Sequence, residues 1–397
     1  MALRRSSLAV LFAMMFSSQL ALTIFLPAVP DIARDLETTL GRTQLIIPAY
    51  LIAFALMQLI VGPLSDRFGR RPVIMGGVAL FMLASLACAF ATDIWQLLGG
   101  RLFQAAGACA SIVVGRATVR DTNDGKATAQ AMSYMAISLG VGPAIAPLIG
   151  AELVETFNWR ATFLVTALAS GLSLIMAFPV LRETLPEDAR ERIDMLQLFR
   201  GYLALLRRAG FMGYSLTVSF QSSIFQIFMT AAPIVLISQL GVTPKVFGIY
   251  LMVIPIAFIS GSFVSGRLVR HLPVDLVVGV GCVMGVLGGL LQLGLALTDL
   301  ATPTWIVTAI LVSNFGTGLV LANCYAQALN TVPPSFAGAA SAMGGFLHMG
   351  VAFVMALIVA NLPHTLSLQM GMVQTATTIL SLTVFLLVVR ICGRRGG

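Results

Sequence analysis

A short polar loop separates two long apolar stretches near the start of the chain: Gly62-Pro63-Leu64-Ser65-Asp66-Arg67-Phe68-Gly69-Arg70-Arg71-Pro72-Val73. The loop carries one acid and three arginines between segments that are apolar enough to lie in lipid. Gly69 permits the positive φ angle of a tight turn, and Pro72 suits the first turn of a following helix. Asp66 is close enough in sequence to pair with any of the three arginines. The stretch therefore predicts an ion-paired turn between the ends of two membrane helices.

The composition around this loop is that of a polytopic membrane protein. Of the 397 residues, 58% are hydrophobic and 10% are charged, whereas a soluble chain carries about 25% charged residues. The mean hydropathy is +0.94. A transmembrane helix needs about 20 mostly apolar residues, and the apolar runs predict twelve such spans. They cover residues 8–30, 44–63, 72–91, 95–118, 127–152, 160–181, 210–238, 245–268, 275–297, 304–330, 338–361 and 366–390.

Lys and Arg gather on one side of these predicted spans. If the N-terminus is cytoplasmic, 18 of the 24 Lys and Arg residues fall on the cytoplasmic side, in agreement with the positive-inside rule. We therefore expect a multi-pass protein with an uncleaved first span and with both termini in the cytoplasm. The net charge of +8 arises from these loops, so we expect the lipid bilayer, and no nucleic acid, among the partners.

The spans divide six and six around one charged stretch, residues 182–209, which is amphipathic from Asp194 onward and typical of a helix on the membrane surface. The second half repeats the loop with one inserted residue, at the equivalent place, as Ser265-Gly266-Arg267-Leu268-Val269-Arg270-His271-Leu272-Pro273-Val274. We therefore predict an all-α integral membrane fold with two pseudo-symmetric six-helix bundles, residues 1–181 and 210–397, joined by a cytoplasmic linker over 182–209. This arrangement allows one half to rock against the other.

A charged residue inside a span is costly and is a candidate functional residue. Arg101 lies early in the fourth span and should face the bundle interior or a watery cavity, with Gln104 on nearly the same face. A structural arginine bonded to backbone carbonyls is the alternative. Arg116 follows in the same span, on nearly the same face as Arg101, and could instead extend its charge to the membrane surface.

Further polar residues within the spans could line a substrate cavity or bond one helix to another: Tyr50, Gln221, Gln226 and Asn323. His348 in the eleventh span could titrate near neutral pH, although a single histidine packed among helices is more often structural. The five cysteines are isolated and form no CxxC pair, so we expect neither a disulfide nor a metal site. No phosphate-binding GxxxxGK[ST] loop occurs, so we expect no nucleotide cofactor.

Four motifs, in order along the whole chain, resemble those of the major facilitator superfamily. Residues 62–73 resemble its loop signature. Residues 26–30 (Leu-Pro-Ala-Val-Pro), 101–107 and 140–150 resemble its drug-efflux branch, especially the bicyclomycin and chloramphenicol resistance (Bcr/CflA) exporters. The resemblance implies the superfamily fold and a proton-coupled exporter of small organic molecules or drugs in a bacterial inner membrane. It implies transport rather than an enzymatic reaction, the proton gradient as energy source, and a monomer.

The motifs also imply groups of functional residues. The loop would form a cytoplasmic gate with Gly62, Asp66, Arg67, Gly69, Arg70 and Arg71, and Asp121 at the end of span four is a further possible partner. Arg101 would act in proton coupling or substrate binding. The span-five motif would favour export and limit leakage through Gly140, Gly142, Pro143, Ala146, Pro147 and Gly150. Its small residues alone predict close helix packing, and its prolines predict a bend.

One departure from the family pattern concerns the substrate. Related drug–proton antiporters often carry an acid in span one shortly before the Leu-Pro pair, where this chain reads Gln19-Leu20-Ala21-Leu22-Thr23-Ile24-Phe25, with Thr23 at the matching position. Without that acid, a cavity that contains Arg101, Arg116 and His348 favours neutral, zwitterionic or anionic compounds. The alternative function is therefore a carrier or exporter of an anionic or zwitterionic metabolite or a siderophore-like compound.

Overall fold

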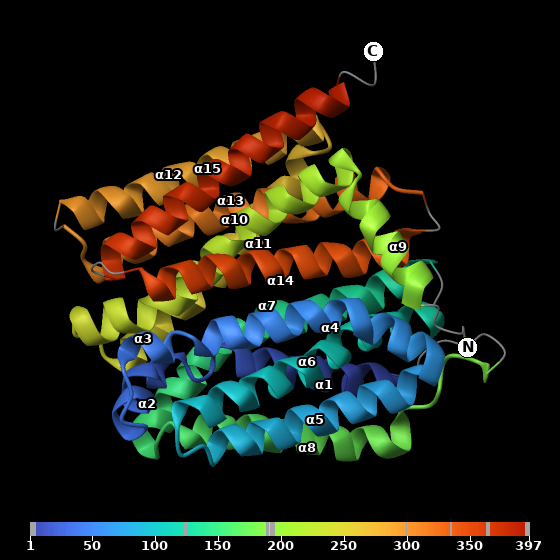
Figure 1. Ribbon diagram of the computed structural model, residues 1–397, viewed down its shortest axis with the longest axis horizontal. Helices are drawn as coiled ribbons and strands as arrows, with labels where there is room; N and C mark the ends of the chain where they lie inside the picture. Colours follow the sequence, from blue (N-terminus) through green and yellow to red (C-terminus); the bar gives the residue numbers. More distant parts are fainter. Residues whose placement is uncertain are drawn as a thin grey trace. The chain divides into compact units, whose positions relative to one another are not determined.

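The computed structural model describes residues 5–122, 125–187, 190, 195–298, 300–333, 336–362 and 366–393, and nearly all of these residues are helical. The predicted all-α membrane fold is confirmed. The chain divides into two compact units, Met1–Asp194 and Met195–Gly397. The division falls inside the charged stretch 182–209. Figure 1 colours the first unit from blue to green and the second from yellow-green to red.

Six long helices dominate the described part of the first unit, and they run side by side (Figure 1). Three short segments follow the first of them, because Pro27 and Pro30 lack the N–H groups that would continue it; the predicted span 8–30 is therefore not one uninterrupted helix. The elements are α1 (Arg5–Thr23), η1 (Leu26–Ala28), α2 (Val29–Asp35), α3 (Leu40–Thr43), α4 (Ile46–Phe68), α5 (Arg70–Ala89), α6 (Ile94–Thr122), α7 (Gly125–Thr156) and α8 (Arg160–Val180).

The second unit repeats this plan after one extra helix, α9, which falls in the predicted amphipathic part of the linker. Its first long helix, α10, continues into a π-helical segment, η3, at Pro233. The elements are α9 (Met195–Leu206), α10 (Ala209–Ala232), η3 (Pro233–Gln239), α11 (Pro244–Leu268), α12 (Val274–Leu297), α13 (Pro303–Asn330), α14 (Ala337–Asn361) and α15 (Leu366–Gly393).

The long helices have the length and the composition of membrane spans. Within the described residues, eleven helical segments are long and apolar enough to cross a membrane. Helix α7, which contains the predicted fifth span, has 32 residues, well above the roughly 20 that a bilayer requires. Each predicted span therefore coincides with one long helix or helical segment, and the chain is a multi-pass membrane protein.

Helix α8 shows how the helices meet lipid. Its large apolar side chains are exposed at Leu164, Leu168, Leu172 and Ile175, on one face of the helix. The opposite face buries small hydroxyl residues, which bond the carbonyls of their own helix. An apolar exterior around a small, polar interior is the packing expected in a bilayer, where small residues allow close approach.

The two units share one pattern of helix contacts. In the first unit α1 packs on α6, α7 and α8, while α5 packs on α6 and α8; in the second unit α10 packs on α13, α14 and α15, while α12 packs on α13 and α15. A pair of facing glycines also recurs. Gly77 and Gly107 join α5 to α6, and Gly281 and Gly316 join α12 to α13. The units are therefore pseudo-symmetric.

The glycine contact predicts a local sensitivity to size. A Cβ atom at Gly107 would lie 2.6 Å from the backbone nitrogen of Phe81 and would also meet the carbonyl oxygen of Gly77. Gly107→Ala should lower stability by about 1–3 kcal/mol, the usual cost of overpacking. Gly99 lies in the same helix with no atom within 4 Å of its Cβ position, so Gly99→Ala should leave the melting temperature in detergent unchanged or slightly raised. Equal melting temperatures for both variants would contradict the proposed close contact.

Candidate functional site

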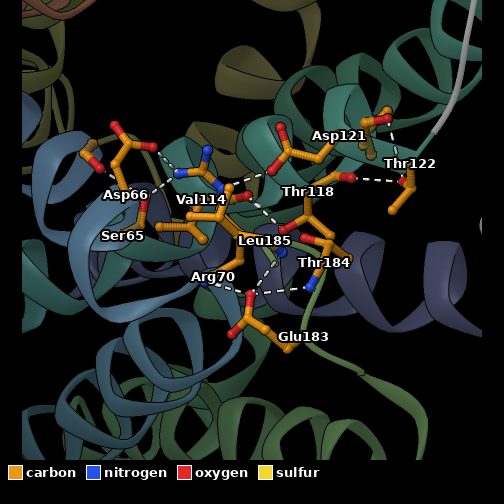
Figure 2. Close-up of polar contacts among 12 residues, drawn as sticks. Ser65, Asp66, Arg70, Val114, Thr118, Asp121, Thr122, Glu183, Thr184 and Leu185 are labelled. Atoms are coloured by element: carbon orange, nitrogen blue, oxygen red, sulfur yellow. Dashed lines mark hydrogen bonds and ion pairs between the residues drawn. The ribbon is translucent and has the colours of Figure 1, made fainter. Parts of the chain in front are cut away.

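Arg70 is the buried centre of an ion-pair cluster at one end of the first unit (Figure 2). The residue is 5% exposed, and its guanidinium bonds side chains of two other helices. Nη1 donates to Ser65 Oγ at 2.6 Å and forms an ion pair with Asp66, both on α4. Nε donates to Asp121 Oδ2 on α6 at 2.8 Å. These four residues, the Arg70 cluster, tie together the ends of α4, α5 and α6.

The turn before Arg70 explains why the cluster can form. Helix α4 ends at Phe68, and Gly69 has φ = +94°, a conformation that side-chain-bearing residues rarely adopt. Its N–H donates to the carbonyl of Ser65 at 3.1 Å. Helix α5 then begins at Arg70, with Pro72 in its first turn. The predicted tight turn is confirmed.

Asp66 forms fewer ion pairs within the loop than the sequence allows. Among the described residues, Asp66 pairs with Arg70 and with neither of the other two loop arginines. The reason is the turn at Gly69, after which the Arg70 side chain is buried, whereas Arg67 is exposed. The Arg67 guanidinium lies over the ring of Phe68, 5.2 Å from its centroid. The Arg71 guanidinium donates to the carbonyl of Phe178 at 3.0 Å. Gly62 lies within α4, and its carbonyl accepts from Ser65 at 2.8 Å.

Glu183, which the sequence analysis missed, binds the same turn from the segment after α8. Its Oε1 accepts from the backbone N–H groups of Arg70 at 2.9 Å and of Thr184 and Leu185 at 3.0 Å. Its Oε2 accepts from the backbone N–H of Arg71 at 3.1 Å. The carboxylate therefore caps the N-terminus of α5, where free N–H groups and the helix dipole favour a negative charge.

The charge state of Glu183 follows from this geometry. Partial burial by itself raises the pKa of the carboxyl, but hydrogen bonds from the backbone N–H groups of Leu185, Arg70, Arg71 and Thr184 outweigh it and lower the pKa below its ordinary value. The same carboxylate occupies the space beside Gly69 where a Cβ would lie. Glycine is thus required at position 69 both for its φ angle and for the room it leaves.

Arg101 is enclosed in the middle of the first unit, as the sequence predicts. It is 0% exposed, and Nη1 donates to the carbonyl of Ala21 at 2.9 Å and to Gln104 Oε1 at 2.5 Å. Its guanidinium lies between two aromatic rings, 4.6 Å from the centroid of Phe25 and 4.4 Å from that of Tyr50. Cation–π contacts of this kind stabilise a cation that has left water.

The guanidinium of Arg101 is not fully satisfied. Its Nε and Nη2 are buried without a hydrogen-bond partner among the described residues. An unpaired buried donor costs free energy, so this arginine can accept an additional acceptor group. Gln104 is held in turn, because its Nε2 donates to Ser85 Oγ at 2.7 Å. Arg116, predicted on nearly the same face, is exposed, and the structure does not bring it together with Arg101.

The span-five motif packs against α1. The small residues at 142, 146 and 150 face it: a Cβ at Gly142 would lie 2.8 Å from Gln19 Cβ, and one at Gly150 would meet the carbonyl of Ile24. Ala146 is fully buried in a cluster that includes Ile24. The predicted close packing is confirmed, and the partner helix lies in the same unit.

Thr23 has a structural partner in this contact. Its hydroxyl donates to the carbonyl of Pro143 at 3.4 Å. That carbonyl has no helical partner, because Pro147, four residues on, has no N–H. Thr23, at the position of the absent acid, thus donates to a carbonyl that the span-five motif leaves without a helical partner. Gly140 is half-buried in the same helix, α7.

Two polar residues of the second unit bond helix to helix. Asn323 on α13 donates to Ser265 Oγ on α11 at 2.8 Å, within the repeated loop segment. Gln221 on α10 donates to the carbonyl of Gly281 on α12 at 3.4 Å. Gln226 is buried, and its Oε1 has no hydrogen-bond partner among the described residues. The ion pairs of the described residues include neither Arg267 nor Arg270.

His348 is half-buried on α14, and its Nδ1 lies 2.7 Å from the hydroxyl oxygen of Tyr325 on α13. The sequence analysis did not single out Tyr325. The described Cys88, Cys109, Cys282 and Cys324 are buried free thiols, and no group of three potential metal ligands occurs among the described residues.

Known proteins are similar to this chain over most of its length. The profile of the Major Facilitator Superfamily matches residues 11–357. An uncharacterised transporter of this type, YdgK from Bacillus subtilis, is 31% identical, with 92% of this chain and 91% of that protein covered. Multidrug resistance protein D of Escherichia coli is 30% identical (90% and 89% covered), and a bicyclomycin resistance protein homolog of Haemophilus influenzae is 27% identical (91% and 90%).

Solved structures with the same fold are more distant in sequence. A crystal structure of a mutant peptide transporter POT in complex with alafosfalin has a TM-score of 0.79 at 13% identity and covers 98% of this chain and 94% of that chain. At this identity the likeness concerns the fold alone.

The cap on α5 predicts a pH-dependent contribution of Glu183. Its pKa is lower in the folded state, so its stabilisation is present above the unfolded pKa, about 4.3 for glutamate, and is lost as the pH falls through the folded pKa. Glu183→Gln should therefore lower the melting temperature in detergent at neutral pH, and this deficit should shrink below about pH 4.

Glu187→Gln is the matched control, because the Glu187 side chain is 89% exposed in the same segment. It should melt like the wild type at every pH. A Glu183→Gln deficit that persists at low pH would mean that the carboxylate charge is not what stabilises the cap.

Proposed function

Because the chain belongs to the Major Facilitator Superfamily, we propose that it is a proton-coupled secondary exporter of small organic molecules, including drugs, that works by alternating access. Two of its full-length relatives carry the names multidrug resistance protein D and bicyclomycin resistance protein homolog. We place it in the bacterial inner membrane with both termini cytoplasmic. It would act as a monomer, with the proton gradient as its energy source and no bound cofactor.

The Arg70 cluster is the observation that supports alternating access most directly. One buried guanidinium holds carboxylates from α4 and α6, so the helix ends are joined by a few directional bonds. Such bonds are strong when formed, and they are lost together when the helices separate. The cluster would thus act as the latch of a cytoplasmic gate that holds one of two conformations.

Arg101 supports the assignment of a membrane-embedded site. A fully buried arginine with two unpaired nitrogens is costly in a bilayer, and such residues commonly mark substrate or ion pathways. A substrate with a carbonyl, hydroxyl or carboxylate group could supply the absent acceptor. Access would require movement of the enclosing rings of Phe25 and Tyr50, a rearrangement consistent with a transport cycle.

A second candidate function is the export of an anionic or zwitterionic metabolite or a siderophore-like compound. It rests on the same unpaired nitrogens of Arg101 and on the absence of an acid at position 23, where Thr23 bonds the carbonyl of Pro143. A carboxylate would satisfy both nitrogens in a bidentate contact, the geometry that a guanidinium favours.

The proposed latch predicts an order of effects on transport for substitutions of its three charged residues. Arg70→Gln should abolish transport while insertion survives, because loss of one partner from a buried pair costs about 3–5 kcal/mol. Asp121→Asn should reduce transport more than Asp66→Asn, since their side chains are 18% and 45% exposed and exposed pairs contribute little. Transport by cells with matched expression measures this order.

Arg67→Gln is the control, because the Arg67 guanidinium lies over a ring and makes no ion pair among the described residues. It should cost less transport than any of the three. An equal loss for Arg67→Gln and Arg70→Gln would show that loop charge alone matters.

A susceptibility panel on an efflux-deficient strain that overexpresses the protein tests the function itself. The compounds are chloramphenicol, which is neutral, tetraphenylphosphonium, which is a cation, and salicylate, which is an anion. Protection against chloramphenicol supports the leading proposal, whereas protection against salicylate alone supports the second candidate. Arg101→Ala should remove the protection in either case; full protection by a well-expressed Arg101→Ala variant would exclude this residue from transport.

A further inference from the structure

Helix α14 of the second unit carries one titratable residue, His348. His348 lies near the midpoint of this helix of 25 residues, which is long and apolar enough to span a membrane. Ala340, Gly344, Ala352 and Ala356 lie on the same row of the helix at intervals of four residues, and all four are buried. His348 therefore belongs to the inward, small-residue face of α14, where its neighbours leave room for an imidazole.

Tyr325 gives this histidine a defined partner. The distance from the tyrosine hydroxyl oxygen to Nδ1 is 2.7 Å, and the two ring centroids are 6.2 Å apart at an angle of 40°. The bond joins α13 to α14. Both ring nitrogens of a protonated histidine donate, and a phenol oxygen can accept, so the same contact serves the neutral and the charged imidazole.

The helices packed most closely on α14 carry few titratable residues. Helix α14 contacts α9, α10, α13 and α15. The titratable residues of α9 are Arg200 and Tyr202, and that of α10 is Tyr214. Helix α13 carries Cys324 and Tyr325, and α15 carries Arg390 and Cys392. Of these, Tyr214 donates to Asp275 and Cys324 is buried. Tyr325 is the group that the structure shows in contact with His348.

The carboxylates of the described residues do not occupy a comparable position. Among the described residues they lie at helix ends, in short helices or in loops: Asp31, Asp35, Glu37, Asp66, Asp93, Asp121, Glu152, Glu155, Glu183, Glu187 and Asp275. His271 is exposed in the turn after α11. Of the side chains that ordinarily change charge between pH 5 and 8, the described spans therefore hold one near a helix midpoint, His348.

We propose that His348, positioned by Tyr325, is the residue that binds and releases the coupled proton during transport. This inference rests on the proposed proton-coupled function and locates the proton in the second unit. An ionisable residue inside a membrane helix is a functional-site candidate on energetic grounds, and histidine is the side chain that changes charge near neutral pH.

His348 can take up and release one proton whichever ring nitrogen carries the hydrogen of the neutral imidazole. If Nδ1 carries the ring hydrogen, it donates to Tyr325, and Nε2 takes a proton from water on one side of the membrane. If Nε2 carries it, the tyrosine hydroxyl donates to Nδ1; protonation of Nδ1 then reverses this bond, and Nδ1 donates to the phenol oxygen. In both cases the imidazole alternates between neutral and singly positive, and it returns the same proton to water on the other side.

The test uses the full chain in liposomes of phosphatidylethanolamine and phosphatidylglycerol. The probe is whichever of chloramphenicol, tetraphenylphosphonium or salicylate the wild type exports in the panel. Two rates are measured: accumulation driven by an imposed pH gradient, and exchange of labelled for unlabelled probe at equal pH. His348→Asn keeps a polar atom near the place of Nδ1 but cannot take up a proton.

We expect His348→Asn to lose gradient-driven accumulation by about tenfold or more, within the usual range of coupling between two sites, and to retain exchange within about twofold of the wild type. His271→Asn should keep both rates. A His348→Asn variant that still accumulates the probe, or that loses both rates while folded, overturns the inference and leaves the transporter assignment standing.

Two further outcomes separate this inference from the proposed function. If the wild type moves no probe, the exporter proposal fails and the proton site fails with it; if the wild type moves the probe without proton flux, the coupling and His348 fail but transport stands. Should His348→Asn not fold, Tyr325→Phe replaces it. Loss of the hydroxyl should shift the pH dependence of exchange, and an unchanged pH profile overturns the role of the pair.

Discussion

The buried guanidinium of Arg70 is the interaction on which the end of the first unit depends. A planar cation with five N–H donors cannot leave water without acceptors, so α4 and α6 must place Asp66 and Asp121 within reach of it. Gly69 then permits the turn that points Arg70 inward. Glu183 holds the same residue through its backbone N–H. One arginine is thus bound through both its side chain and its main chain, by three acids from separate segments.

The second unit keeps the helix packing of the first but not this arrangement, because Arg267 and Arg270 are exposed. The helix pairings and the facing glycines recur, yet Gly266 stands where the first unit has Asp66. Asn323 and Ser265 join α13 to α11 by a neutral hydrogen bond, and the ion pairs of the described residues include neither Arg267 nor Arg270. Neutral bonds are weaker than charge-assisted ones, so the two ends of a pseudo-symmetric molecule differ in how firmly they are held.

The lengths of the apolar runs and the repeat between the halves made the fold predictable from the sequence. The contacts of individual side chains could be predicted only in part. Arg101 with Gln104 could be predicted, because three residues along a helix place two side chains on one face. Glu183 could not, because it lies 113 residues from Arg70 and binds backbone N–H groups, which leave no trace in sequence. Tyr325 resembles any other aromatic residue of a span. Thr23 could be seen as a missing acid, but its bond to the carbonyl of Pro143 emerges only when α1 and α7 are packed.

The absence of an acid at position 23 and the position of His348 both bear on which group inside the membrane can bind a proton. Arg101 cannot lose its proton near neutral pH, so its charge, held between Phe25 and Tyr50, is constant through a transport cycle. A cycle driven by protons needs a second group whose charge changes inside the membrane. With no carboxylate near the midpoint of a described span, we assign that role to the imidazole paired with Tyr325. The fixed positive charge of Arg101 also disfavours a cation beside it, because the two like charges would repel each other throughout a cycle.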